Sequence, residues 1–195
     1  MKKNKTIQPV DGVSENKETH GVSEAFIIKS KIDRNLEELE RDGHSILKNI
    51  FSKNDCEVAK GKIDEIYKRQ IKECGSEEYL ISINDQNVTR ALLVYDDFFL
   101  RFINNKTIKE ILDGCFGKRY ILNLQNSPIN RANDSHFGST WHRDLSYQHF
   151  IPSRPIAISV LVCLYAFTED NGGTHILPFS HKFEVFPSDN YREKN

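Results

Sequence analysis

The character of this sequence changes at Gly117, and that change limits the folds open to the chain. Before Gly117, apolar residues recur at helical spacing, whereas after it, runs rich in β-branched and aromatic residues alternate with Pro and Gly. Helices that precede strands favour an α+β fold, in which the helices buttress an antiparallel sheet or barrel. The runs predicted as strands are residues 119–125, 139–144, 156–167 and 174–177.

The helical half begins with residues 32–40, which have helical spacing and are followed by Gly43 as an expected C-cap. Residues 44–51 alternate weakly between apolar and polar, which predicts a strand. Helical spacing returns in two later stretches, residues 96–102 and 107–115.

A capping-box pattern marks the start of the longest predicted helix. Ser52 stands three residues before Asp55, so the hydroxyl and the carboxylate can satisfy backbone amides of the first turn. The helix is expected to reach about Glu73, with Gly75 at its end. The sequence of residues 76–95 does not clearly predict either a helix or a strand.

Composition predicts one globular domain with a polar tail. Residues 1–22 hold almost no large apolar groups, so we expect a flexible tail there and a single domain over 23–195, with helices to about residue 117 and a β-core over about 118–195. The 27 basic and 28 acidic residues nearly cancel, which gives no electrostatic case for nucleic acid.

A cytoplasmic location is expected from the cysteines and from the hydropathy. The four cysteines are widely spaced without a C-x-x-C pair, as in reduced cytosolic proteins. No apolar segment follows the basic start of the chain, so no secretory signal is predicted. The apolar run 156–167 is too short to cross a membrane and reads as a buried strand.

His142 and Asp144 carry the strongest chemical signal. On a strand, residues two apart point to the same face, so the imidazole and the carboxylate would converge on one point. Two such ligands from one strand, with a distant His, form the 2-His-1-carboxylate triad that leaves positions open on Fe(II). The plainer interpretation is a surface pair without metal. Arg143, between them, would point to the other side.

Three pieces of the sequence, taken together, resemble the phytanoyl-CoA dioxygenase family of Fe(II)- and 2-oxoglutarate-dependent oxygenases. Residues 41–52 (RDGHSILKNIFS) are similar to the family's opening segment, and residues 141–144 (WHRD) are similar to its H-x-D metal motif. Residues 169–182 (EDNGGTHILPFSHK) are similar to its N-G-g…P-G-S-H segment. The likeness covers about residues 40–187.

The resemblance implies a double-stranded β-helix, or jelly-roll, core buttressed by the N-terminal helices. It implies Fe(II) bound by His142 and Asp144, with 2-oxoglutarate as co-substrate. The expected reaction hydroxylates a small organic substrate and forms succinate and CO₂. Asp144 favours hydroxylation over halogenation, since related halogenases carry a small residue at that position. Candidate contacts to the co-substrate are Gln125, Asn126 and Arg143.

Two departures from the family pattern affect these expectations. Phe179 stands where the family usually has Gly. The family's second His ligand and its 2-oxoglutarate-binding Arg lie beyond the P-G-S-H segment, so we expect this chain to lack the last strands, to bind metal weakly and to be inactive by itself. The third ligand is expected beyond residue 195. In-chain alternatives are His175 and His181, and then His136 and His149.

Two other readings of the sequence stay open. One is a non-catalytic jelly-roll remnant that binds a small molecule or a protein. The other is a cupin-like metal enzyme independent of 2-oxoglutarate, although the H-x-H pattern usual in cupins is missing from this sequence. Neither the substrate nor the oligomeric state is indicated, because the loops that select substrates, such as 76–95 and 145–155, follow no sequence rule.

Overall fold

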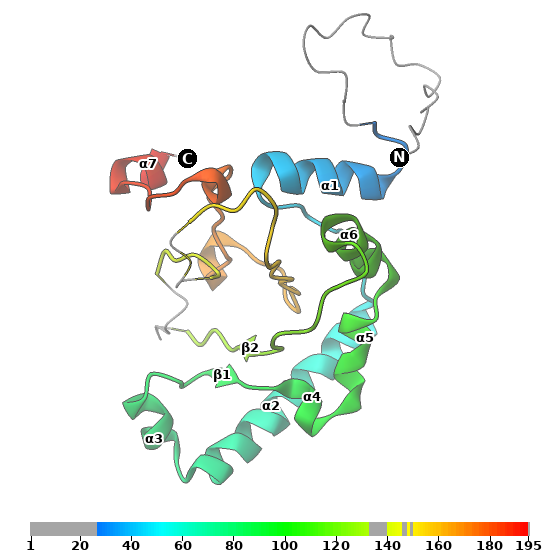
Figure 1. Ribbon diagram of the computed structural model, residues 1–195. Helices are drawn as coiled ribbons and strands as arrows, with labels where there is room; N and C mark the ends of the chain where they lie inside the picture. The colour runs from blue at the N-terminus through cyan, green and yellow to red at the C-terminus, as the bar shows by residue number, and fades with distance from the viewer. Residues whose placement is uncertain (1–26, 133–139, 146–147, 149, 195) are drawn as a thin grey trace, which may run out of the picture.

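The computed structural model describes residues 27–132, 140–145, 148 and 150–194 (Figure 1). Its first elements are α1 (Lys31–Asp42), α2 (Lys53–Cys74), α3 (Glu77–Ser82), β1 (Val88–Thr89), α4 (Leu92–Tyr95), η1 (Asp97–Phe99), α5 (Leu100–Ile103) and α6 (Lys106–Phe116). These are followed by β2 (Ser127–Pro128), η3 (Glu169–Asn171), η4 (Ser180–Lys182) and α7 (Asp189–Lys194). Helices and a small sheet make the described part of the chain α+β, as predicted.

The predicted ends of the first two helices are confirmed. Gly43 caps α1 in the left-handed conformation, with φ +82°, and its amide donates to the carbonyl of Leu39. Ser52 caps α2, because its hydroxyl accepts from the Asp55 amide at 3.0 Å. The Asp55 carboxylate accepts from the Ser52 hydroxyl instead of from the cap amide.

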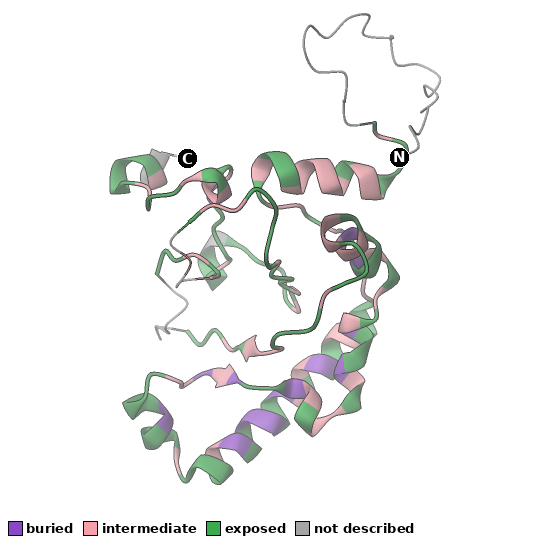
Figure 2. Ribbon diagram, in the orientation of Figure 1, coloured by how far each residue is buried: buried purple, intermediate pink, exposed green. Residues whose placement is uncertain are grey.

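The hydrophobic core lies between α2 and the α4–η1–α5 segment, where the buried residues gather in Figure 2. Phe99, which is 1% exposed, stacks on Phe102, and Phe51 packs on Phe102 with ring centroids 4.8 Å apart. Burying each such side chain contributes roughly 1.5–3 kcal/mol. The other members of this cluster are Ala59, Ile63, Ile66 and Leu92.

The prediction of a strand over residues 44–51 is wrong, since these residues form loop and turn. Residues 76–95, which had no clear prediction, contain α3, β1 and α4. The two-stranded sheet pairs Val88 with Pro128 and Thr89 with Ser127 in antiparallel register.

The predicted strands after Gly117 are absent from the described part of the second half, which is mainly extended coil (Figure 1). Residues 119–125, 140–144, 156–167 and 174–177 carry no ladder, and Ser139 lies outside the described residues. A strand requires a neighbour that accepts its hydrogen bonds, and the only pairing in the described ranges is β1 with β2.

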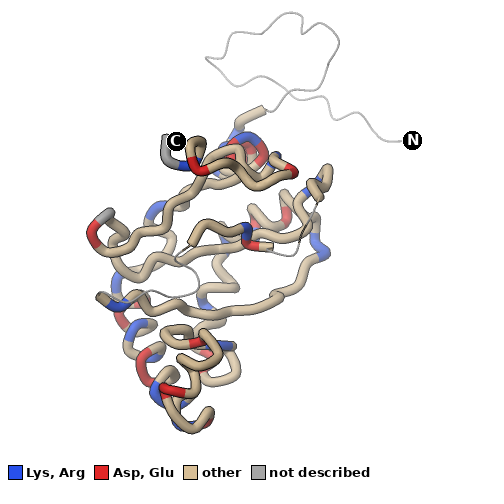
Figure 3. Tube along the Cα trace, turned by 90° about the vertical axis from the view of Figure 1, so that its left-hand side faces the viewer, with Lys and Arg blue, Asp and Glu red and all other residues tan. Residues whose placement is uncertain are grey.

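The prediction that the 156–167 run is buried holds only in part. Val162 and Leu164 pack against the helical core, but Ile156, Leu161 and Tyr165 are exposed. The same exposure is found in 119–125, where Ile121 is 88% exposed. Residues 156–167 contain no charged side chain and 119–125 contain only Arg119, while Figure 3 shows many of the acidic and basic residues on the coiled parts of the trace.

Two side-chain contacts hold α1 against α6 and α7 against the residue that follows η4. Leu36 of α1 packs on α6 at Gly114, where an added Cβ would lie 2.6 Å from Leu36 Cδ1. Close to α7, the rings of Phe183 and Tyr191 meet edge to face at 5.7 Å. None of the helices described is both long and apolar enough to cross a lipid bilayer.

Candidate metal site

His142 and Asp144 lie in the coil segment 140–145, and their side chains approach each other. Nε2 of the imidazole is 3.8 Å from Oδ1 of the carboxylate. The segment is coil with bends at residues 140, 144 and 145, so the two side chains meet through the local course of the chain and not through the strand alternation predicted from the sequence. The imidazole is 44% exposed and the carboxylate 65% exposed, so both are open to an incoming ligand.

The backbone of the same segment orients the imidazole. His142 Nδ1 lies 2.7 Å from the carbonyl oxygen of Thr140. A carbonyl only accepts, so Nδ1 carries the proton in this bond, and in the neutral ring Nε2 keeps its lone pair. That lone pair is on the nitrogen nearest to Asp144. A His held in this way is a common arrangement for a metal ligand.

The two donor atoms are close enough for one divalent ion to contact both, although neighbouring ligands of a facial set lie nearer to each other, at about 3 Å. An imidazole nitrogen or a carboxylate oxygen binds such an ion at about 2.0–2.2 Å. The 3.8 Å separation is less than twice that length, so one ion can contact both atoms. Nitrogen together with carboxylate oxygen is also the donor set of non-haem Fe(II) sites. Within the described residues, no further His, Cys, Asp or Glu completes a group of three.

Arg143, between the two residues of the pair, makes its hydrogen bonds to a distant segment of the chain. Its guanidinium turns to the segment after η4, where Nη2 donates to the carbonyl of Phe183 at 2.5 Å and to that of Glu184 at 3.0 Å. Arg143 thus joins the His142–Asp144 segment to a part of the chain some forty residues later.

Gln125 and Asn126 contact the turn before α4. The Asn126 side-chain oxygen accepts from the amide of Ala91, a residue with φ +49°, and the Gln125 backbone carbonyl accepts from the next amide along, that of Leu92. The Gln125 side-chain nitrogen donates to the carbonyl of Phe99 at 3.3 Å, while its buried Oε1 has no partner in the described part of the chain. These bonds support the α4–η1 segment.

The other histidines occupy different places. His175 is exposed in the coil before Leu177. His181 is half-buried, and its Nε2 donates to the carbonyl of Glu40 at 3.1 Å. His136 and His149 lie outside the described residues.

Residues 177–183 form a turn that docks on the end of α1, a contact that single-residue reasoning missed. The amide of Phe179 donates to the carbonyl of Asp42 at 2.8 Å, and Lys182 Nζ lies 3.1 Å from a Glu40 carboxylate oxygen. The His181 ring packs against Gly43 so closely that a Cβ there would collide with it. Two of the pieces that carry the resemblance, residues 41–52 and 169–182, therefore touch. Their occurrence together in one sequence was the signal from which this contact could have been predicted.

Phe179 has a left-handed backbone, with φ +65° and ψ −9°. This conformation is easy for Gly and unfavourable for other residues. The Gly that the resemblance implies at this place would adopt this conformation without strain. Likewise Gly172, with φ +73°, ends the turn after η3, although no hairpin strands flank it in the described structure.

Charge around this docked turn favours the ionised form of Asp42. Two hydrogen bonds from Arg41 lower the pKa of the Asp42 carboxyl, and the nearby imidazoles of His44 and His181 lower this pKa further.

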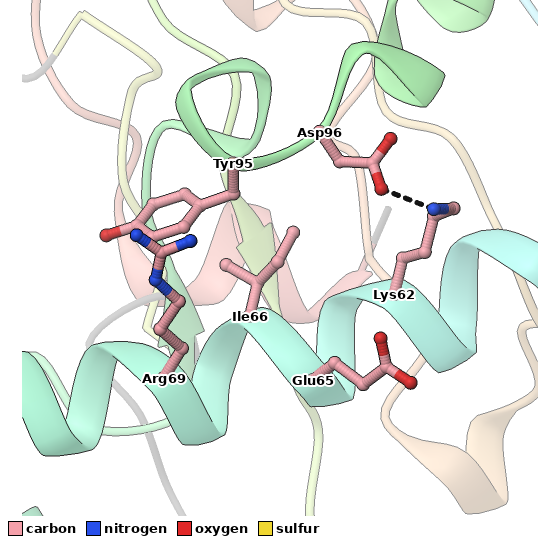
Figure 4. A pocket seen from close by; sticks show the side chains of 6 residues that line it. All are labelled: Lys62, Glu65, Ile66, Arg69, Tyr95 and Asp96. Carbon is pink, nitrogen blue, oxygen red and sulfur yellow. Dashed lines mark hydrogen bonds and ion pairs between the residues drawn. The ribbon is translucent and has the colours of Figure 1, made fainter.

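A separate pocket of about 170 Å³ opens between α2 and the α4–η1 junction (Figure 4). Lys62 pairs there with Asp96, and the Arg69 guanidinium lies over the Tyr95 ring. The pocket is smaller than the roughly 300–1,000 Å³ of most small-molecule sites. None of the residues predicted for the metal site lines it.

Comparison with known proteins identifies a family. Residues 39–195 match the family model described as phytanoyl-CoA dioxygenase. The chain is also 21% identical over 171 residues to the uncharacterized proteins Mb1539 of Mycobacterium bovis and Rv1501 of Mycobacterium tuberculosis. The aligned region is 85% of this chain but 62% of each relative, so the chain spans less than two thirds of their length. No solved structure is significantly similar to the chain.

Proposed function

Because the chain belongs to the phytanoyl-CoA dioxygenase family, we propose that it is part of an Fe(II)- and 2-oxoglutarate-dependent oxygenase that hydroxylates a small organic substrate. The proposal includes the jelly-roll core of such enzymes and a cytoplasmic location. The activity of the whole protein is part of the proposal, since the curated relatives extend well beyond the aligned region and are themselves uncharacterized.

The observation that carries the proposal is the pair formed by His142 and Asp144. Its two donor atoms are 3.8 Å apart, belong to the H-x-D sequence and lie within the region matched to the family. Both side chains are open to solvent, which leaves room for a co-substrate and O₂ beside the metal.

Each residue has a defined task in this proposal. His142 binds through Nε2, while its Nδ1–H donates to the Thr140 carbonyl and fixes the plane of the ring. Asp144 binds through a carboxylate oxygen and offsets part of the charge of the cation. Bound Fe(II) would supply the oxidative decarboxylation of 2-oxoglutarate with O₂, which gives succinate and CO₂ and oxidises a C–H bond of the substrate.

The third ligand is proposed to be a histidine outside the His142–Asp144 pair, beyond residue 195 as the resemblance implies. Within the chain, His175 is the more accessible candidate, because its imidazole is exposed. His181 uses its Nε2 for the Glu40 carbonyl, so ligation through that atom would require the turn to leave α1. Gln125, Asn126 and Arg143 stay proposed contacts of the co-substrate, with the bonds described above as their alternative roles.

Succinate formation tests the proposed function. The protein is incubated with Fe(II), 2-oxoglutarate, ascorbate and O₂, and succinate is quantified together with oxygen uptake. We expect His142→Ala and Asp144→Ala to abolish succinate formation. Asp170→Asn is the control, because it changes an exposed carboxylate outside the metal pair, and it should keep the activity. If the wild type forms succinate and both site variants form it at the wild-type rate, the assignment of these two residues is overturned.

A further inference from the structure

Arg143 makes the long-range contacts of the segment that holds the His142–Asp144 pair. The hydrogen bond of His142 goes to Thr140 and its Nε2 lies 3.8 Å from Oδ1 of Asp144, so both of these contacts remain inside residues 140–144. Arg143 Nη2, in contrast, donates to two carbonyls, those of Phe183 and Glu184. One terminal guanidinium nitrogen carries two N–H groups, so both bonds can form at once.

The acceptors of Arg143 belong to a segment that is itself fixed. The amide of Phe183 donates to the carbonyl of Ser180 at 3.0 Å, which closes the η4 turn. That turn is joined to α1 through the amide of Phe179, the imidazole of His181 and the ammonium of Lys182. A continuous series of contacts therefore runs from α1 through the turn to Arg143.

We propose that Arg143 is a positioning residue for the metal pair. By holding residues 142–144 against Phe183 and Glu184, it keeps Nε2 of His142 and Oδ1 of Asp144 at a separation that one ion can bridge. This role rests on the proposed function and adds to it a residue that need not touch metal or co-substrate. The side chains of His142 and Asp144 are 44% and 65% exposed, so few other contacts with the described part of the chain restrain them, and an unrestrained pair binds metal less tightly.

Nη2 of Arg143 makes both hydrogen bonds, and this determines how strongly each variant should weaken the restraint on the metal pair. A Lys ammonium has three donors and can serve two carbonyls, but its stem is shorter and it lacks the rigid guanidinium plane. Arg143→Lys should therefore restore part of the restraint. Arg143→Met removes the donors and keeps the apolar stem. Arg154→Met is the matched control, since Arg154 is an exposed Arg that follows the metal pair along the chain.

The experiment measures metal affinity and local backbone exchange on the full chain. Mn(II) serves as the probe, and its free concentration is followed by electron paramagnetic resonance during titration of each variant. We expect Arg143→Met to weaken Mn(II) binding about 10- to 100-fold, Arg143→Lys to weaken it less, and Arg154→Met to leave it unchanged. Amide hydrogen exchange over residues 141–145 should be faster in Arg143→Met and intermediate in Arg143→Lys.

The outcomes distinguish the positioning role of Arg143 from the proposed metal site and function. Unchanged exchange in Arg143→Met would show that the restraint does not exist, and faster exchange with unchanged affinity would show that it does not serve the metal. Either result overturns the positioning role and leaves the proposed function standing. Failure of the wild type to bind Mn(II) would instead overturn the proposed metal site, and the positioning role with it. If Arg143→Met loses its folded circular-dichroism signal, Arg143→Lys decides alone, with wild-type affinity and exchange as the overturning result.

Discussion

The imidazole of His181 occupies the space that a side chain on Gly43 would need. Gly43 also has φ +82°, so two independent constraints act on this position. We expect Gly43→Ala to destabilise the fold by about 1 kcal/mol from the left-handed backbone alone, and by more because the ring must move. Urea unfolding followed by circular dichroism measures the total effect.

Gly172→Ala separates the two contributions, because Gly172 is also left-handed, with φ +73°, but an added Cβ there would meet only Asn130 Nδ2 at 3.4 Å, an ordinary contact. Its cost should be smaller than that of Gly43→Ala. In the His181→Ala background, Gly43→Ala should cost about as much as Gly172→Ala. If Gly43→Ala costs no more than Gly172→Ala in the wild-type background, the docking of the turn on α1 is not as described.

Phe179 offers the opposite test, since a residue with a Cβ already adopts φ +65° there. Phe179→Gly and Phe179→Ala remove the same ring, but only Gly relieves the left-handed backbone. We expect the Gly variant to be more stable than the Ala variant by about 1 kcal/mol. At an ordinary negative φ the order would be reversed, because Gly loses more entropy on folding. Urea midpoints of the two variants decide between the orders.

Sequence patterns predicted best those elements that local chemistry determines. Ser52 and Asp55 define the start of α2 within one turn, and Gly43 and Gly75 define helix ends, because caps act over a few residues. Residues 156–167 illustrate the limit of such reasoning. Their β-branched composition favours extended backbone, but a ladder depends on a partner strand that composition does not supply.

The candidate site was predictable to a similar degree. His142 and Asp144 are two residues apart, so their closeness is a local property, but it arises on a coil with bends and not on the strand that the sequence predicted. The contact of Arg143 with Phe183 and Glu184 depends on how distant segments pack, so the sequence indicated only that Arg143 would turn away from the pair.

Asp55 gives the fold a predictable response to acid. Hydrogen bonds from Ser52 and from Arg101 lower the pKa of its carboxyl. A carboxyl with a lowered folded-state pKa contributes stability above its unfolded pKa, about 3.9 for Asp, and this contribution is lost as pH falls through the folded pKa. Asp55→Asn should therefore reduce stability at pH 7 and flatten the fall of stability below about pH 4. Urea unfolding between pH 7 and pH 2.5 measures both effects, and parallel curves for the two proteins would refute this role.

Phe99 and Ile121 represent the two apolar environments of the chain. Phe99 is 1% exposed inside the helical core, so Phe99→Ala should cost about 3–5 kcal/mol of unfolding free energy. Ile121 is 88% exposed, so Ile121→Ala should change the stability by less than about 0.5 kcal/mol. Thermal unfolding of the two variants gives the comparison, and a cost for Ile121→Ala near that of Phe99→Ala would mean that the 119–125 segment is buried in solution.

Anaerobic equilibrium dialysis of the chain against Fe(II) tests the metal pair most directly. Asp144→Asn keeps the size of the side chain and removes its charge, and His142→Ala removes the nitrogen ligand. We predict weak binding that saturates at one Fe(II) per wild-type chain, and a loss of at least about 10-fold in affinity in each variant, with Asp170→Asn unchanged. Fe(II) bound equally well by all four proteins, or by none of them, would contradict the assignment of His142 and Asp144 as metal ligands.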